Sequence, residues 1–231
     1  MPKALITGAS QGFGRALLTA LVAQGWTCVV DARDARALRK VTAALPGVRA
    51  VPGDVSDPDH RADLVAATDG RVDLLVHNAS TLGPSPLPQL TDYPLDALRR
   101  VFEVDVVAPL ALTQTALPAL RAAPTPTIVV LSSDAAVEAY PGWGGYGSAK
   151  AALDHLAAVL AVEHPELRVY AFDPGDMRTA MHQAAFPTED ISDRPEPGTV
   201  AVPAVRALLA HRPPSGRYRA ADVLMPVGAG R

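Results

Sequence analysis

Tyr146 and Lys150 form a Tyr-x-x-x-Lys pair, a spacing that suits proton transfer to or from an alcohol. Residues four apart lie on one face of a helix, so the phenol and the ammonium can point into one cleft. A free tyrosine titrates near pH ~10, and a nearby cation stabilises the phenolate, so we expect Lys150 to lower the pKa of Tyr146. Lys150 is one of only three lysines among 21 basic residues, which favours a specific role for it.

A serine hydroxyl precedes this pair. Ser133 follows the apolar run 127–131 and stands thirteen residues before Tyr146. A hydroxyl donor beside an oxygen that gains negative charge lowers the barrier to hydride addition at the neighbouring carbon. The three residue types therefore indicate chemistry on a carbonyl or an alcohol.

A glycine-rich turn opens the chain. Gly8, Gly12 and Gly14 follow the apolar run 4–7 with the spacing G-x-x-x-G-x-G, and a helical pattern begins directly after them. Glycine lets a ligand approach the backbone, and a helix amino terminus offers free N–H groups to a pyrophosphate. A tight turn alone would also explain three glycines, but their place after the first strand favours dinucleotide binding.

These residues need a scaffold, and the rest of the chain predicts an α/β fold. Short apolar runs alternate with helical patterns from end to end, which favours a doubly wound, Rossmann-type parallel sheet of about seven strands with helices on both faces. We treat residues 1–231 as a single domain. The expected strands are 4–7, 27–30, 48–51, 72–76, 127–131 and 167–172, with a last one within 217–223, and the expected helices are 15–23, 34–44, 58–67, 95–120, 149–162 and 200–209.

Two proline-rich stretches interrupt this alternation. Residues 81–94 and 176–198 carry several prolines each, which predicts irregular backbone. Ligands of open α/β sheets bind beyond the carboxyl ends of the strands, so we expect the loop around 176–198 to border the substrate. For 81–94, a plain surface loop is an equal alternative.

The motifs together resemble the short-chain dehydrogenase/reductase family, whose glycine motif TGxxxGxG matches Thr7 to Gly14. The resemblance implies that Tyr146 is the general acid/base, that Ser133 holds the substrate oxygen, and that Lys150 also binds the nicotinamide ribose. It further implies a set of cofactor-binding residues: Gly8, Ser10, Gln11, Gly12, Phe13, Gly14, Arg33, Asp54, Val55, Asn78, Ala79, Tyr146, Lys150, Pro174, Gly175, Met177 and Thr179.

The chain departs from the family pattern at several positions. His77 and Ser80 flank Asn78 and Ala79 where the family has Asn and Gly, and we expect His77 to pack or to touch the cofactor. Asn78 still ties neighbouring strands together or holds the adenine-ribose side. Asp54 matches the family's adenine-contacting Asp, although a turn-forming Asp is as good a reading.

Asp105 stands where the family commonly has Asn, and we count it as a fourth member of the catalytic set. An ionised Asp cannot donate a hydrogen bond, and its charge offsets part of the pull of Lys150 on Tyr146. Alternatively, its backbone carbonyl does the work and the side chain matters little. On either reading, Asp105→Asn should leave turnover unchanged or raise it.

In this family, residues at the end of the second strand determine whether the protein prefers NAD or NADP. Counting 24 residues from Gly8, the position of the family's NAD-selecting Asp is Ala32, and Arg33 follows directly. Asp31 is one residue early, on the other face of the strand. This favours NADP. NAD stays an alternative, because a one-residue slip would bring Asp31 to the ribose and Gln11 stands where many NADP-preferring members carry a basic residue.

The composition argues against nucleic-acid-binding, membrane and metal-binding proteins. The 231 residues carry a net charge of −3 with no dense run of Lys or Arg, which disfavours nucleic acid and membrane partners. Cys28 is the only cysteine, so neither an internal disulfide nor a cysteine zinc site can form, and the six histidines lack metal-ligand spacing. No run of about 18 apolar residues or leader pattern is present, so the expected location is the cytoplasm.

The predicted function is an NADPH-dependent reductase that interconverts a carbonyl and a secondary alcohol, with a small-molecule substrate. Apolar faces in 95–120 and 149–162 resemble those through which family members form homodimers. The alternative is a dinucleotide-binding sensor or scaffold with weak catalysis, which His77, Ser80 and Asp105 motivate.

Overall fold

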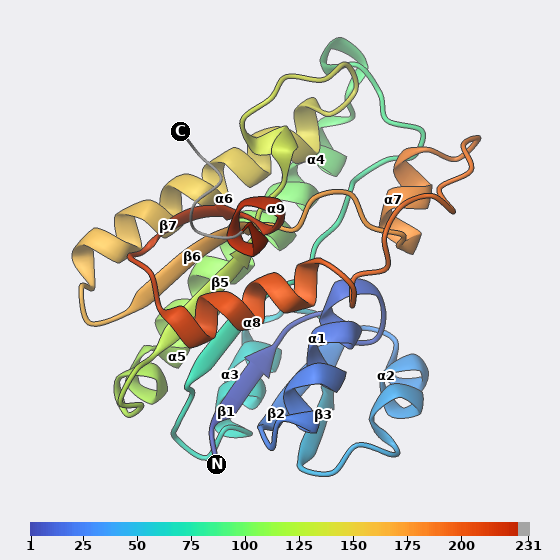
Figure 1. Cartoon of the computed structure of the whole chain (residues 1–231). Coiled ribbons are helices and arrows are strands. Elements are labelled where there is room, and N and C mark those ends of the chain that lie inside the picture. Colours follow the sequence, from blue (N-terminus) through green and yellow to red (C-terminus); the bar gives the residue numbers. More distant parts are fainter. Residues whose placement is uncertain (226–231) are drawn as a thin grey trace.

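The computed structural model describes residues 1–225 and contains a seven-stranded parallel sheet of order β3-β2-β1-β4-β5-β6-β7 (Figure 1). This confirms the predicted fold class. The first six strands lie where the apolar runs predicted them. The seventh ends earlier than expected, because a helix begins at Ala220. The strands are β1 (Lys3–Ile6), β2 (Thr27–Ala32), β3 (Val48–Pro52), β4 (Leu74–His77), β5 (Thr127–Leu131), β6 (Arg168–Asp173) and β7 (Gly216–Arg219).

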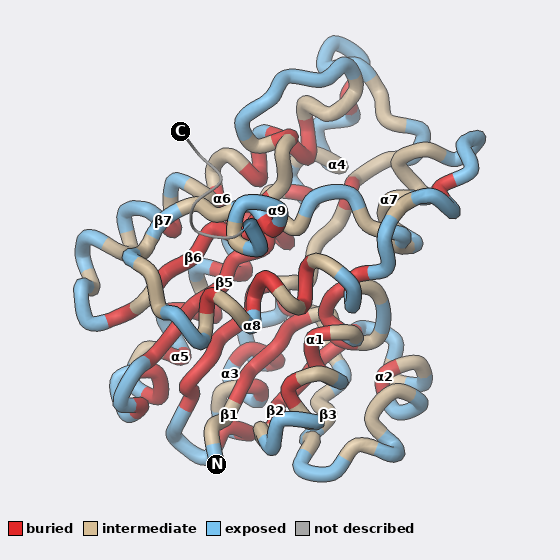
Figure 2. The backbone as a smooth tube through the Cα atoms, in the orientation of Figure 1, coloured by how far each residue is buried: buried red, intermediate tan, exposed pale blue. Residues whose placement is uncertain are grey.

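Helices cover both faces of the sheet because the inner strands are buried on both sides. One core packs α1 (Gly12–Ala23), α2 (Ala35–Thr42) and α8 (Ala201–His211) on one face, and Leu17, Leu38 and Val205 represent these helices in it. The second core packs α3 (Pro58–Ala66), α5 (Ala108–Arg121) and α6 (Gly144–Glu163) on the other. The central strands β4 and β5 are buried along their whole length, whereas the edge strands β3 and β7 are partly exposed (Figure 2).

The expected helix 95–120 is broken into three parts. α4 (Leu95–Phe102) and α5 flank a π-helical turn over Glu103–Val107, and Asp105 lies in the middle of that turn. Such turns widen the helix by one residue and are frequent at functional sites. The periodicity of the sequence did not reveal the turn, because its residues keep the apolar pattern of a regular helix.

Other boundaries differ by a few residues. The helix expected from Ala149 starts five residues earlier, so Tyr146 lies inside α6 and shares its first turns with Lys150. The chain after β7 forms the short α9 (Ala220–Leu224). Among residues 1–225, no helix has the length and apolar character that a membrane span requires.

The two proline-rich stretches meet above the carboxyl ends of the strands (Figure 1). Residues 81–94 contain a 3₁₀ turn at Leu90–Asp92, and 176–198 contains the short α7 (Ala180–Ala185). The Ser85 hydroxyl donates a hydrogen bond of 2.7 Å to the carbonyl oxygen of Ala184, which joins the two stretches. The chain therefore builds a wall on the side of the sheet where α/β proteins bind ligands.

Candidate active site

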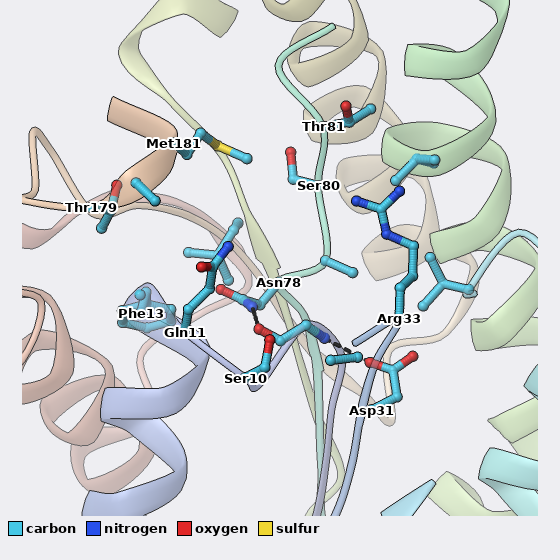
Figure 3. Close-up of a pocket in the computed structure, with 18 of the residues that line it drawn as sticks. Ser10, Gln11, Phe13, Asp31, Arg33, Asn78, Ser80, Thr81, Thr179 and Met181 are labelled. Atoms are coloured by element: carbon cyan, nitrogen blue, oxygen red, sulfur yellow. Dashed lines mark hydrogen bonds between the residues drawn. The ribbon is translucent and has the colours of Figure 1, made fainter. Parts of the chain in front are cut away.

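A cleft of about 760 Å³ runs along the carboxyl ends of the strands (Figure 3). The loops after β1, β2, β4, β5 and β6 all contribute to it. Most residues that the sequence marked as site candidates line this cleft: Gly8, Ser10, Gln11, Gly12, Phe13, Arg33, Asp54, Val55, Asn78, Ala79, Tyr146, Lys150, Pro174, Met177 and Thr179. Ser133 and Gly175 line a smaller cavity beside it, and Gly14 and Asp105 lie outside both linings.

The glycines of the first turn are required by close packing. Gly8 has a φ of +70°, and a Cβ there would come within 2.8 Å of the Ala79 backbone. A Cβ on Gly14 would lie 2.5 Å from the Asn78 side chain, so Gly14 shapes the loop from below without lining the cleft. The loop backbone can therefore adopt this path only with glycine at these positions.

The amino terminus of α1 is open to an anion. Its N-cap residue Gln11 makes no side-chain cap, and the first turn holds no acidic residue. By contrast, Asp34 caps α2 and Asp57 caps α3 with hydrogen bonds to backbone N–H groups. The free N–H groups and the positive end of the helix dipole of α1 thus face the cleft, as a phosphate-binding helix requires.

Asn78 fastens the glycine loop to β4. Its Nδ2 donates to the carbonyl oxygens of Thr7 at 2.7 Å and Gly8 at 3.0 Å. The Thr7 hydroxyl in turn accepts from the backbone N–H groups of Asn78 and Ala79 at 3.0 Å each. These bonds tie β1 to β4, which is one of the two roles expected for Asn78.

The Asp31 carboxyl group forms hydrogen bonds beneath the glycine loop. One carboxylate oxygen accepts from the Gly8 N–H at 2.6 Å, and the other lies 3.1 Å from His60 Nε2. The side chain is 1 % exposed, and burial raises its pKa despite these two partners. Asp31 therefore holds the loop, and it also lines the cleft next to Ala32 and Arg33.

Arg33 follows on the exposed end of β2 and lines the cleft (Figure 3). Among residues 1–225, no carboxylate lies within 4 Å of its guanidinium, so its charge is free for a ligand. Farther along this edge, Arg100 from α4 pairs with Asp54 at 2.6 Å. Burial opposes the ionisation of Asp54, but hydrogen bonds from Ser56 and Arg100 outweigh it and lower its pKa.

Lys150 and Tyr146, both on α6, point into the end of the cleft opposite the glycine loop. The Lys150 ammonium donates to the Leu131 carbonyl oxygen at 2.9 Å and lies 5.3 Å from the centre of the Tyr146 ring. Both side chains are buried, with Lys150 2 % and Tyr146 8 % exposed. The expected proximity of phenol and ammonium is present.

The expected lowering of the Tyr146 pKa is not seen in this structure. Burial raises its pKa strongly, the nearby carboxylates of Asp105 and Asp134 raise it further, and the Ser80 hydroxyl opposes them. A nearby cation alone would lower the pKa of Tyr146, but burial in the folded protein penalises the phenolate more. Tyr146 therefore holds its proton at neutral pH.

Ser133 lies in the smaller cavity, about 100 Å³ in volume, whose lining it shares with Tyr146. Its hydroxyl donates to Asp134 at 2.9 Å and accepts from the Ala135 N–H at 3.2 Å. Trp143 packs edge-on against Tyr146, with ring centres 5.8 Å apart, and forms an aromatic wall of this cavity. The Ser133 hydroxyl must turn away from Asp134 to bind another oxygen.

Asp105 lies beneath the cleft and has no exposed surface. Its carboxylate is bonded to the Ser80 hydroxyl at 2.7 Å and to the Thr81 N–H at 2.9 Å, and one oxygen is 3.8 Å from the Lys150 ammonium. Burial raises the pKa of Asp105, although Lys150 and the hydrogen bonds oppose the rise. The predicted neighbour relation between Asp105 and Lys150 is therefore present.

His77 packs inside the sheet, which is one of the two roles expected for it. Its Nε2 lies 2.8 Å from the Thr113 hydroxyl. Burial, together with the charge of Lys150, lowers its pKa to about 3, so it is neutral at physiological pH. The part of the chain that the structure describes holds no group of three potential metal ligands.

Sequence reasoning missed Arg100, which lines the cleft, and Trp143, which lines the smaller cavity. They come from α4 and from an irregular loop, where spacing carries no signal. Thr81, Met181 and His182 lie in the two proline-rich stretches that the sequence offered as walls of the site, and they also line the cleft or the smaller cavity. Ser80 also lines the cleft, and its departure from the family's glycine was the one available sign of a role.

Comparison with known proteins agrees with this geometry. A sequence profile described as short chain dehydrogenase matches residues 2–190. The chain is 34 % identical to sepiapterin reductase of Rattus norvegicus over 202 residues, covering 80 % of this chain and 77 % of the relative. It is 34 % identical to L-xylulose reductase of Bos taurus over 187 residues, covering 80 % and 75 %.

Solved structures give the same answer. A short chain dehydrogenase of Shigella flexneri, solved in complex with NADP, superposes with a TM-score of 0.85 at 27 % identity and covers 95 % of this chain and 97 % of its own. The profile matches most of the chain, a reductase shares 34 % of the aligned residues, and a solved dehydrogenase superposes over nearly the whole length. This chain therefore belongs to the short-chain dehydrogenase family.

Proposed function

We propose that this protein is an NADPH-dependent reductase that converts a carbonyl compound into a secondary alcohol. The observation that carries the proposal is one continuous cleft with an anion-binding loop at one end and Tyr146 and Lys150 at the other. A dinucleotide spans such a cleft when its phosphates sit on the loop and its reactive ring reaches the proton donor.

The residues present fit an NADP molecule. The open amino terminus of α1 suits the pyrophosphate, and the free guanidinium of Arg33 suits the 2′-phosphate. Asp31, the carboxylate that a one-residue slip would bring to the ribose, is held by Gly8 and His60. The Shigella flexneri relative that carries NADP supports the same choice.

When bound, NADPH supplies the hydride, and the protein supplies the proton and the placement. Tyr146 gives its phenolic proton to the oxygen of the reduced carbon, and its raised pKa keeps that proton in place until the oxygen becomes basic. The Ser133 hydroxyl donates a hydrogen bond to the same oxygen from the adjoining cavity. Reduction is therefore the direction that the resting protonation state favours.

The Lys150 ammonium has two partners within the protein, the Leu131 carbonyl oxygen and the Asp105 carboxylate. Its bond to the Leu131 carbonyl oxygen and its ion pair with Asp105 fix the ammonium beneath the Tyr146 ring. We assign it to stabilise the phenolate that forms as Tyr146 loses its proton, and to bind the nicotinamide ribose.

The substrate enters, on this proposal, beside the wall of 81–94 and 176–198. The smaller cavity is lined by apolar residues, among them Leu82 and Trp143, and by the acidic residues Asp134, Asp173 and Asp176. This mixed lining favours a compact substrate that carries both an apolar part and hydrogen-bonding groups next to its carbonyl. The segment 176–198 is then the substrate loop of a single catalytic domain.

We also propose a homodimer. Apolar side chains remain exposed around α5 and α6, and the largest exposed fractions there belong to Val162 and Val107. Burial of this face against a second copy would remove these side chains from water. Light scattering after gel filtration, with Val162→Glu as the disrupting variant, tests it. A cytoplasmic location fits the single, buried, free thiol of Cys28.

The experiment for the proposed function is a fluorescence titration of the purified protein with NADPH and NADH, followed by a panel of carbonyl compounds. The panel contains sepiapterin, L-xylulose and small aryl ketones. Tighter binding of NADPH with turnover of any of them supports the reductase. Tight binding without turnover of any carbonyl would favour a dinucleotide sensor instead.

A further inference from the structure

His60 lies outside the cleft but contacts Asp31, which lines it. The ring Nε2 of His60 is 3.1 Å from the Asp31 oxygen Oδ2, and the other oxygen, Oδ1, accepts from the Gly8 N–H at 2.6 Å. A carboxylate only accepts hydrogen bonds, so Nε2 of His60 carries the proton between them. The two partners together hold the Asp31 carboxylate beneath the glycine loop.

The fold makes room for this histidine. His60 is the third residue of α3, and the first turn of that helix is fixed by the Asp57 cap and by Pro58. The histidine is 7 % exposed, and a Cβ at Gly53, just after β3, would overlap its ring. Glycine at this position therefore lets the imidazole pass under the end of β3 and reach Asp31 on β2.

Asp31 stands next to the position that decides cofactor choice. Asp31, Ala32 and Arg33 follow one another at the end of β2, and all three line the cleft (Figure 3). A carboxylate here can accept a hydrogen bond from the ribose 2′-hydroxyl of NADH, whereas it repels the 2′-phosphate of NADPH. An NADPH-binding cleft therefore needs this carboxylate to be engaged elsewhere.

We propose that His60 sets the preference for NADPH by holding the Asp31 carboxylate under the glycine loop, away from the ribose of the cofactor. The proposal rests on the proposed function, because it concerns the cofactor of that reaction. It makes His60 a positioning residue that acts through Asp31, in addition to the direct contact assigned to Arg33.

The expected consequence of losing His60 follows from the two bonds of Asp31. Oδ2 would lose its N–H donor, while Oδ1 would keep the Gly8 N–H. A buried carboxylate oxygen without a donor is costly, so Asp31 gains by accepting from a ribose hydroxyl instead. The same charge, no longer engaged by His60, opposes a 2′-phosphate more strongly. NADH affinity should therefore rise as NADPH affinity falls.

The test is calorimetric titration of the purified protein with NADPH and NADH, and with 2′,5′-ADP and ADP, which carry only the adenosine end. His60→Leu removes the donor. His60→Asn and His60→Gln form a matched pair of amides, because the glutamine amide reaches the place of Nε2 and the asparagine amide stops near that of Nδ1. Each substitution is repeated in an Asp31→Asn background.

Arg61→Met is the control for loosening of the same helical turn. Arg61 is 8 % exposed, and its Nη1 donates to the Val55 carbonyl oxygen at 2.7 Å, at the same end of the cleft. No hydrogen bond or ion pair joins it to Asp31 within the described residues. Its loss should change the affinities for NADPH and NADH by the same factor.

We expect His60→Leu and His60→Asn to shift the ratio of the two Kd values toward NADH on the order of 10-fold, the scale of one hydrogen bond to a charged group. The ADP pair should shift alike, which places the effect at the ribose. His60→Gln should keep the wild-type ratio. In the Asp31→Asn background, substitutions at His60 should leave the ratio unchanged, because the carboxylate on which they act is gone.

A His60→Leu variant that weakens both cofactors equally, or neither, overturns the proposal, as does a shift that persists in the Asp31→Asn background. If His60→Leu does not fold, the asparagine and glutamine variants decide by the same ratio, and equal ratios in these two overturn it.

Binding separates this proposal from the proposed function. If the wild type binds NADPH more tightly than NADH but reduces no carbonyl, the proposed reductase fails, and the Kd ratios still judge His60. If the wild type prefers NADH or binds neither dinucleotide, the role of His60 is overturned.

Discussion

The two ends of the cleft handle charge in opposite ways. At the glycine loop, the carboxylate of Asp31 is already bonded to Gly8 and His60, while backbone N–H groups and Arg33 remain free. At the α6 end, Tyr146, Lys150 and Asp105 are titratable, buried and close together. The first end is organised to bind fixed negative charge, and the second to move a proton.

This contrast implies that the two ends can be disabled separately. Substitutions near the loop should change cofactor affinity and leave the chemical step alone. Substitutions on α6 should act mainly on the chemical step, with a smaller effect on cofactor affinity through the contact of Lys150 with the nicotinamide ribose. Variants at the two ends of the cleft should therefore differ in whether affinity or turnover changes.

Lys150→Met should have the largest effect. It removes the buried cation that faces Tyr146 and Asp105 while keeping much of the side-chain volume. We expect kcat to fall by about 10²–10³-fold, the scale for losing one preorganised electrostatic group. Steady-state kinetics with the exposed Lys40→Met as control measure it, and a loss confined to NADPH affinity would break the separation.

Arg33→Ala should act at the other end. Loss of a charge-assisted bond to the 2′-phosphate should weaken NADPH by about 10–100-fold and leave NADH affinity nearly constant. Arg36→Ala, one helical turn away on the exposed side of α2, is the control. An equal loss for both cofactors would show that Arg33 does not read the phosphate.

Gly8→Ala should destabilise the loop by more than backbone strain alone. Gly8 and Gly25 both have positive φ, but a Cβ at Gly25 meets nothing within 4 Å, whereas one at Gly8 meets the Ala79 backbone. We expect Gly8→Ala to cost about 1–3 kcal/mol beyond Gly25→Ala in thermal unfolding, from overpacking. Equal losses in the two variants would contradict the close packing of the loop.

His77 should make stability fall in mild acid. Its pKa is about 3 in the folded protein and about 6.5 when unfolded, so below pH 6.5 the unfolded state binds a proton that the folded state does not. Between pH 6 and pH 5 this contributes a loss of about 1 kcal/mol in unfolding free energy. Denaturant titrations of wild type and His77→Gln test it: the variant should lose less over this interval, and equal losses would refute it.

The parallel sheet could be predicted because its strands are short apolar runs separated by helical patterns, and both signals are local. Tyr146 and Lys150 were found because their spacing on one helix is fixed by helix geometry. The glycine loop was found because its backbone path excludes other residues at Gly8 and Gly14.

What could not be predicted depends on contacts across the chain. The π-helical turn at Asp105 leaves no mark in an apolar pattern, and the bond between Ser80 and Asp105 joins residues 25 positions apart. The pKa of Tyr146 was predicted in the wrong direction because burial depends on every element packed around it. The motifs located the site residues, whereas the burial that sets the pKa of Tyr146 depends on the complete fold.

The central claim is that the cleft binds NADPH and that Tyr146 supplies the proton for carbonyl reduction. Its most direct test is single-turnover oxidation of pre-bound NADPH by wild type and Tyr146→Phe, with the carbonyl panel as acceptors. We expect both proteins to bind NADPH with the same Kd and only the wild type to oxidise it at an appreciable rate. Equal rates in the two proteins, or no oxidation by the wild type with any acceptor, would contradict the account.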